Sequence, residues 1–189
     1  MNTDTLQQHT VPAMPAFRVG TPCDFARVTA FYDLVTDYSN AQAYGPCWQK
    51  DVHPSRAFLS ASLQNGRLYL LEQGDTILAA MVLNHETHPA YQGVPFAGTQ
   101  DPQQVYVIHL LCVHPRHYGK GYAKRMLSEA VRIGREDGLQ SLWLDVLYNN
   151  VSAVQLYRSF GFRLAATIPG MYDVFIGPTD GELYEYPLI

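Results

Sequence analysis

Hydrophobic positions along this chain recur with two periods, one typical of helices and the other of strands. A helical period begins after Asp24, a residue type that favours helix N-termini. Its apolar positions, three and four residues apart, are Phe25, Val28, Phe31, Tyr32 and Val35. The same reasoning predicts three more helices, over residues 55–64, 121–136 and 151–160, each followed within two residues by a glycine.

Strand-like runs separate and follow these helices. Residues 67–73 and 76–84 flank the turn Gly74-Asp75, which predicts a hairpin. Residues 104–113 form a longer apolar run that suits a central strand. Shorter predicted strands are 17–19, 141–147, 163–167 and 183–188. The order β-α-α-β-β-β-α-β-α-β-β predicts one mixed sheet with a parallel βα unit in its middle.

The remaining segments show no period. Residues 1–15 are polar and contain two prolines, so we expect a flexible extension before a single domain over 16–189. Residues 39–54 and 87–102 are predicted to be irregular loops. No internal repeat and no linker divides the chain.

Composition narrows the class of protein. The 189 residues are 47% hydrophobic and carry a net charge of −4, which argues against nucleic-acid and acidic-membrane binding. The wide spacing of Cys23, Cys47 and Cys112 suggests neither a disulfide framework nor a zinc site, so no metal is expected. No apolar run is long enough to span a membrane and no signal-peptide pattern is present, so we expect a cytoplasmic protein.

The turn Tyr118–Ala123 lies between an apolar strand and an amphipathic helix. Its two glycines allow close approach to the backbone, and the helix start offers unpaired N–H groups to a phosphate. A P-loop is excluded because Gly119-Lys120-Gly121 lacks the following Ser or Thr. A dinucleotide fingerprint is excluded because Lys124 stands where its third glycine is required. A plain βα turn with a glycine cap is the alternative.

A second motif lies downstream. Its order is Asn-x-x-Ala-x-x-Leu-Tyr-x-x-x-Gly-Phe, formed by Asn150, Ala153, Leu156, Tyr157, Gly161 and Phe162. Together with Val113-His114-Pro115 and the glycine turn, this motif resembles the GNAT superfamily of acyl-CoA-dependent N-acetyltransferases. The motifs cover residues 106–162, under a third of the chain. The resemblance implies a mixed, mostly antiparallel, V-splayed sheet with helices on both faces and with acetyl-CoA, the co-substrate, in the splay.

The resemblance also implies the cofactor contacts. The family turn usually begins with Gln or Arg and continues with two small residues. One frame aligns Tyr118, Gly121 and Ala123, and a rival frame aligns Arg116, Gly119 and Gly121. In either frame, backbone N–H groups bind the pyrophosphate. The residues predicted to bind it are Tyr118, Gly119, Lys120, Gly121, Tyr122 and Ala123.

The acyl-pantetheine arm is expected to lie along the end of the 104–113 strand. Leu111, Cys112 and Val113 resemble the family strand whose backbone pairs with the pantetheine amides. The Leu111 N–H is our candidate for polarising the acetyl carbonyl. Asn150 resembles a pantetheine-binding residue, and as a helix N-cap it has a purely structural alternative.

Two residues are predicted to carry the proton transfers. Tyr157 matches the family tyrosine that donates a proton to the leaving thiolate, and ordinary packing on the sheet is the alternative. His109 is the first candidate for the base, and a hydrogen-bonded strand histidine is the alternative. We expect His109 to share a strand face with Leu111, two residues later. Asp145 on the neighbouring strand is the second candidate.

The predicted reaction is transfer of an acetyl group from acetyl-CoA to a primary amine of a small molecule, within a ternary complex. Cys112 has no evident cationic partner, which disfavours a covalent acetyl-enzyme. Tyr44 and Trp48 are the candidate substrate-binding residues, and Tyr91 and Phe96 are placed across from them.

The alternatives to this function are a non-catalytic acyl-CoA-binding or sensing domain, and a protein or peptide N-acetyltransferase. A homodimer formed through the final strand, 183–188, is an open expectation.

Overall fold

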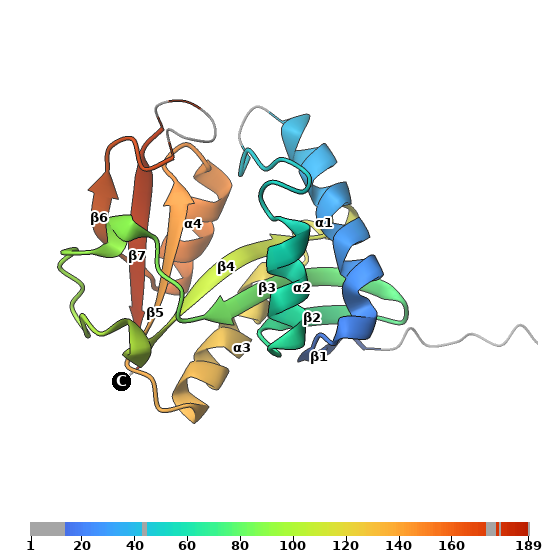
Figure 1. Cartoon of the computed structure of the whole chain (residues 1–189), viewed down its shortest axis with the longest axis horizontal. Coiled ribbons are helices and arrows are strands. Elements are labelled where there is room, and N and C mark those ends of the chain that lie inside the picture. The colour runs from blue at the N-terminus through green and yellow to red at the C-terminus, as the bar shows by residue number, and fades with distance from the viewer. Residues whose placement is uncertain (1–13, 43–44, 173–176, 178, 189) are drawn as a thin grey trace, which may run out of the picture.

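The computed structural model describes residues 14–42, 45–172, 177 and 179–188, which build one sheet in the order β1-β2-β3-β4-β5-β7-β6 (Figure 1). Its strands are β1 Ala16–Val19, β2 Leu68–Gln73, β3 Thr76–Asn84, β4 Val105–Val113, β5 Ser141–Leu147, β6 Arg163–Ile168 and β7 Gly181–Pro187. Among the strands of the described ranges, only β4 and β5 pair in parallel. The prediction of a mixed, mostly antiparallel sheet is therefore confirmed.

Within the described residues, four α-helices cover the two faces of this sheet (Figure 1). Residues of α1, Phe25–Asn40, and α2, Arg56–Gln64, share a core with one face. Residues of α3, Tyr122–Glu136, and α4, Val151–Phe160, share a core with the other. The bounds of α2, α3 and α4 lie within one residue of the predicted ones, and α1 ends at Asn40, inside the segment 39–54 that was predicted to be irregular. The periodicity was decisive because every one of these helices buries one apolar stripe.

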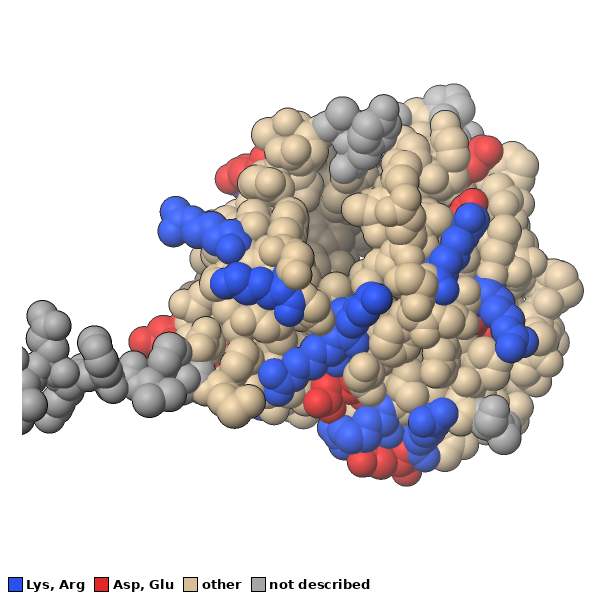
Figure 2. Space-filling model, turned by 180° about the vertical axis from the view of Figure 1, so that it is seen from behind, with Lys and Arg blue, Asp and Glu red and all other residues tan. Residues whose placement is uncertain are grey.

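The two halves of the sheet separate between β4 and β5. These strands pair only where Val105–Val107 faces Ser141–Trp143, and beyond that point they diverge (Figure 1). A hollow opens in the middle of the molecule when it is seen from behind, with Lys and Arg side chains along its lower rim (Figure 2). The V-splayed sheet expected from the motifs is confirmed.

A bulge interrupts β4 at the start of this separation. His109 pairs with Val82 of β3, but Cys112 pairs with Ala80, so two residues of β4 stand opposite one of β3. Leu110 has a φ of +55°, in the left-handed region that residues with a side chain rarely adopt. A bulge of this kind changes the side-chain alternation along the strand.

The bulge overturns one prediction about β4. The His109 ring contacts Phe58 of α2, at a centroid distance of 6.1 Å, whereas Leu111 packs against the core on the α3 and α4 side. His109 and Leu111 therefore face opposite sides of the sheet, and the expectation of a shared face is wrong. The i, i+2 rule fails because the extra residue, Leu110, shifts the alternation by one position.

The last strand also differs from expectation. β7 lies between β5 and β6 and pairs with both, so the edges of the sheet are β1 and β6. The expectation that residues 183–188 form an edge for dimerisation is wrong. The sequence of a short strand does not say which strands it will pair with, because its backbone forms the same kind of hydrogen bonds at the edge of a sheet and inside it.

The connection between β3 and β4 contains the short 3₁₀ helices Pro89–Tyr91 and Pro102–Gln104. Its Phe96 ring stacks on Trp143 of β5 at 3.8 Å. The buried Glu185 of β7 accepts hydrogen bonds from the Ala97 and Gly98 backbone N–H groups, at 2.6 and 3.0 Å. Residues 85–104 are therefore anchored to the β5–β7 half of the sheet.

Within the ranges described above, no helix is long and apolar enough to cross a membrane. The same residues include no group of three or more His, Cys, Asp or Glu side chains placed to hold a metal ion.

Candidate active site

The glycine turn meets the N-terminus of α3. Gly119 and Gly121 have φ values of +76° and +78°, and a Cβ added to either would meet no atom within 4 Å. Glycine is thus required there by backbone conformation, and the space beside both residues is open. Gly121 is the N-cap of α3, so the first N–H groups of this helix have no partner within it. These features fit an anionic group at the turn.

The side chains at the turn include one tyrosine that packs on α1 and several exposed cations. Tyr118 packs edge-to-face on Tyr38 of α1 at 5.5 Å, and burial raises its pKa to about 12. Arg116, Lys120 and Lys124 are exposed, and none forms an ion pair with a described acidic side chain. Cations without acidic partners near a helix N-terminus favour phosphate binding.

Tyr157 of α4 belongs to the core on the α3 and α4 side of the sheet, where its ring lies 5.8 Å from that of Phe162 and 6.4 Å from that of Tyr184. Its side chain is 8% exposed, and its hydroxyl forms no hydrogen bond to any residue in the described ranges. Burial, together with the negative charge of Asp145, raises the pKa of Tyr157 well above its ordinary value. The hydroxyl is therefore protonated at neutral pH and available to donate.

Asn150 stands at the start of α4, where its Oδ1 accepts a hydrogen bond from the Ala153 N–H at 3.4 Å. The N-cap role is thus confirmed. The pantetheine contact stays a prediction.

His109 is held by a polar contact on the α2 side of the sheet. Its Nε2 lies 2.8 Å from Oδ1 of Asn84, which also accepts the Glu86 backbone N–H at 3.0 Å. Because an amide oxygen only accepts, Nε2 carries the hydrogen and Nδ1 the lone pair of the neutral ring. Burial lowers the pKa of His109, although the charge of Asp145 opposes this shift, and the ring is neutral at pH 7.

Asp145 lies in β5 on the same side of the sheet as His109. Its carboxylate accepts hydrogen bonds from the hydroxyls of Tyr91, at 2.7 Å, and Tyr172. Sequence reasoning missed Tyr172 and Asn84 as parts of this site. No local signal identifies them, because their partners are 27 and 25 residues away along the chain.

The bulge in β4 is tied to α1 by a buried hydroxyl. Tyr32 donates a hydrogen bond to the Leu110 carbonyl oxygen at 3.2 Å. In a trans peptide the following N–H, that of Leu111, points the opposite way, toward the α3 and α4 side. Burial raises the pKa of the Cys112 thiol well above its ordinary value, which opposes a nucleophilic thiolate.

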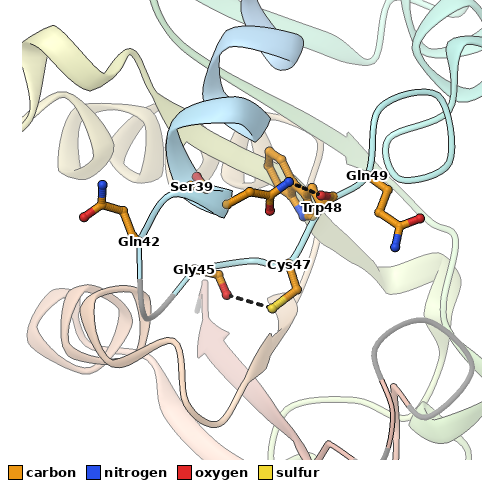
Figure 3. A pocket seen from close by; sticks show the side chains of 7 residues that line it. Ser39, Gln42, Gly45, Cys47, Trp48 and Gln49 are labelled. Atoms are coloured by element: carbon orange, nitrogen blue, oxygen red, sulfur yellow. Dashed lines mark hydrogen bonds between the residues drawn. The ribbon is translucent and has the colours of Figure 1, made fainter.

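Of the two candidate substrate-binding residues, the structure describes one. Tyr44 lies outside the described residues. Trp48 is 8% exposed and packs on Tyr32, with ring centroids 5.9 Å apart, and its carbonyl accepts from Asn40 at 3.0 Å. In Figure 3 its ring turns in beneath α1, beside a pocket of about 280 Å³. The pocket is lined by Ser39, Asn40, Gln42, Gly45, Cys47, Trp48 and Gln49.

Comparison with known proteins identifies the class to which this fold and site belong. A profile of the acetyltransferase (GNAT) family matches residues 29–162, more than half of the chain. This protein therefore belongs to the GNAT family. The resemblance inferred from the two motifs is confirmed.

A solved structure shows the same fold over nearly the whole chain. It is a putative acetyltransferase from Salmonella typhimurium determined with acetyl-CoA, with a TM-score of 0.67 and 18% identity, covering 94% of this chain and 95% of its own.

Relatives of known activity match over shorter segments. The streptothricin acetyltransferase of Streptomyces lavendulae is 32% identical over 72 residues, 38% of each chain. The ribosomal protein bS18-alanine N-acetyltransferase of Haemophilus ducreyi is 38% identical over 70 residues, 37% of this chain and 48% of the relative. The chain thus spans less than two thirds of the length of the first curated relatives it matches.

Proposed function

We propose that this protein transfers an acetyl group from acetyl-CoA to a primary amine of a small molecule within a ternary complex. One observation carries the proposal. The opening between β4 and β5 has Tyr157 on one side of the sheet and His109 with Asp145 on the other. A donor and acceptor substrate can meet in such an opening, each with its own proton-transfer group.

The roles follow from the state of each group. The protonated Tyr157 hydroxyl, without a protein partner, suits donation of a proton to the leaving thiolate. The neutral His109 ring, with a lone pair on Nδ1, suits removal of a proton from the amine. The Leu111 N–H, directed by the bulge, is the candidate donor to the acetyl carbonyl.

The glycine turn supports acetyl-CoA as co-substrate. Open space beside Gly119 and Gly121, the N-terminus of α3 and the unpaired cations Arg116 and Lys124 all suit its pyrophosphate. The proposed CoA contacts are the backbone of 111–113 and 118–123 and the side chain of Asn150. Trp48 and Tyr44 remain the proposed substrate contacts.

The relatives include enzymes for small molecules and for a ribosomal protein. We call the side of the sheet that carries His109 and Asp145 the acceptor side. The anchored 85–104 connection favours a small acceptor, because its Tyr91 extends across the acceptor side to Asp145. A protein substrate needs an open groove there. Peptides with an N-terminal alanine, assayed beside small amines, separate the two substrate classes.

The test is Tyr157→Phe, assayed by thiol release from acetyl-CoA with a panel of primary amines. We expect kcat to fall about 100-fold with little change in the affinity for acetyl-CoA, because only the proton donor is lost. Tyr186→Phe is the matched control, since it removes a hydroxyl from the same aromatic cluster. Acetyl-CoA binding with no thiol release from any acceptor would instead support the sensing domain.

A further inference from the structure

The Asp145 carboxylate is held by tyrosine hydroxyls and not by a cation. Tyr91 donates to Oδ1 and Tyr172 to Oδ2, from connections that precede β4 and follow β6. No ion pair among the described residues includes Asp145. A carboxylate accepts about four hydrogen bonds, so both oxygens retain capacity for a ligand.

The groups around this carboxylate supply no positive charge. The pKa values of His53 and His109 are both lowered, because surrounding protein disfavours their charged forms. His53 is exposed to solvent, and its ring packs edge-to-face on Trp48. Both rings are therefore neutral at pH 7. The negative charge of Asp145 acts on both rings, and that of Glu86 also acts on His109.

An ionised carboxylate in such a place selects its ligand by charge. A partly buried charge without a partner is unfavourable, and a cationic group on the ligand removes that cost. A ligand carboxylate would be repelled by Asp145, which forms no ion pair with any described Lys or Arg side chain. The acceptor side therefore suits an ammonium group and disfavours an amino acid.

We propose that Asp145 binds the amino group of the acceptor as an ammonium ion, and that the acceptor carries no carboxylate beside that group. Alkyl amines reach the protein protonated at neutral pH, since their pKa values resemble that of lysine, about 10.4. Tyr91 and Tyr172 orient the carboxylate, and His109 remains the proton acceptor. This inference rests on the proposed acetyltransferase function.

The experiment compares matched acceptors that differ only by a carboxylate: phenethylamine with phenylalanine, and tyramine with tyrosine. Thiol release from acetyl-CoA gives kcat and KM, and calorimetry in the presence of CoA gives amine binding without turnover. For the wild type we expect kcat/KM at least 10-fold higher for each amine than for its amino acid.

The decisive variant is Asp145→Asn, because its amide can still accept from one tyrosine and donate to the other. We expect the KM and Kd for the amine to rise at least 10-fold, the KM for acetyl-CoA to stay within twofold, and the preference for amines to disappear. Glu86→Gln removes an exposed charge of the same sign and is the control. Tyr172→Phe keeps the carboxylate charge and should keep the preference.

The outcomes separate the two hypotheses. Unchanged amine binding in Asp145→Asn, or a wild type that prefers the amino acids or binds neither amine, would overturn the ammonium site. Amine binding that is lost in Asp145→Asn, with no thiol release from the wild type, would support the site while refuting the acetyltransferase function.

Discussion

The hydroxyl of Tyr32 shows how one atom can set backbone geometry several residues from the chemistry. It holds the Leu110 carbonyl on the α1 side of the sheet, and Leu110 adopts a φ of +55° there. This hydrogen bond thereby orients the peptide between Leu110 and Leu111, so that the Leu111 N–H points toward the α3 and α4 side. A strained residue of this kind persists only when its surroundings enforce it.

Replacing Tyr32 with Phe removes this hydrogen bond and keeps the ring. We expect the free energy of unfolding to fall by about 1–2 kcal/mol, because a buried carbonyl loses its donor. We also expect kcat to fall several-fold while the KM for acetyl-CoA changes little. Tyr69→Phe, a buried tyrosine whose ring stacks on Phe17, is the control for hydroxyl loss. An unchanged kcat in Tyr32→Phe would show that the bulge needs no such support.

The lowered pKa of His109 predicts how the activity depends on pH. Burial lowers it below 6.5, so His109 is neutral and able to accept a proton above that pKa and becomes protonated as the pH falls through it. We expect kcat/KM to decline on the acidic side with a midpoint below 6.5. His109→Gln should lower kcat about 100-fold and abolish this acidic decline.

The pH profiles of the wild type and of His109→Gln are compared because the ionisation of the amine substrate affects both equally. The difference between the profiles therefore reports on His109. His85→Gln is the matched control, because the His85 ring bonds to the Val105 carbonyl and packs on Tyr106. An acidic decline that persists in His109→Gln would assign the base elsewhere.

At the scale of elements, a single buried carboxylate attaches the 85–104 connection to the sheet. Besides the two backbone N–H groups, Glu185 accepts from the Ser141 hydroxyl at 2.8 Å and the Trp143 indole at 3.4 Å. All four partners are donors. The connection in turn carries Tyr91 to Asp145, so the anchor at β7 supports the side of the sheet where we propose that the acceptor binds.

Glu185→Gln should loosen this connection. An amide NH₂ would face a donor whichever way it turns, and we expect a loss of about 2 kcal/mol in the free energy of unfolding. Amide hydrogen exchange should accelerate across 85–104. Glu129→Gln, at a surface pair with Arg132, should change stability by less than about 0.5 kcal/mol. Unchanged exchange across 85–104 would show that Phe96 and its neighbours suffice to anchor the segment.

At the scale of the whole molecule, the two halves of the sheet are joined by three residue pairs between β4 and β5. The glycine turn belongs to one half and α4, with Tyr157, to the other. A molecule of acetyl-CoA in contact with both would link the halves. At a concentration 100 times its Kd, such a ligand stabilises the folded state by about 2.7 kcal/mol.

Direct transfer predicts that acetyl-CoA alone leaves the protein unmodified. Intact-mass spectrometry after incubation with acetyl-CoA should show no added acetyl group, because desolvation raises the pKa of the partly buried Cys112 thiol. Cys112→Ala should retain acetyl transfer to amines. An acetyl group found on Cys112, released when an amine is added, would contradict the ternary complex.

The sequence was most informative where structure is local. Helix bounds followed from periodicity, Gly119 and Gly121 indicated open space beside the backbone, and Asn150 indicated a helix N-cap. The two motifs identified the family because each is a short set of residues at a fixed spacing along the chain. Each of these features lies within a few residues of its cause.

The partners of the acceptor side could not be predicted in this way. The Asn84 amide on His109 and the Tyr172 hydroxyl on Asp145 are contacts between segments that the chain brings together only on folding. Their residue types are ordinary for surface and loop positions. No spacing along the chain distinguishes them from other asparagines and tyrosines.

By itself, then, the sequence determined the α/β class, the order and length of the elements, the glycine turn and the family. The tertiary structure decided that β7 lies inside the sheet, that His109 and Leu111 face opposite sides, and that two tyrosines hold Asp145. The physical reason is that strands pair through backbone hydrogen bonds, which all residue types form alike. Only the packing of the whole chain therefore selects one strand order and one register.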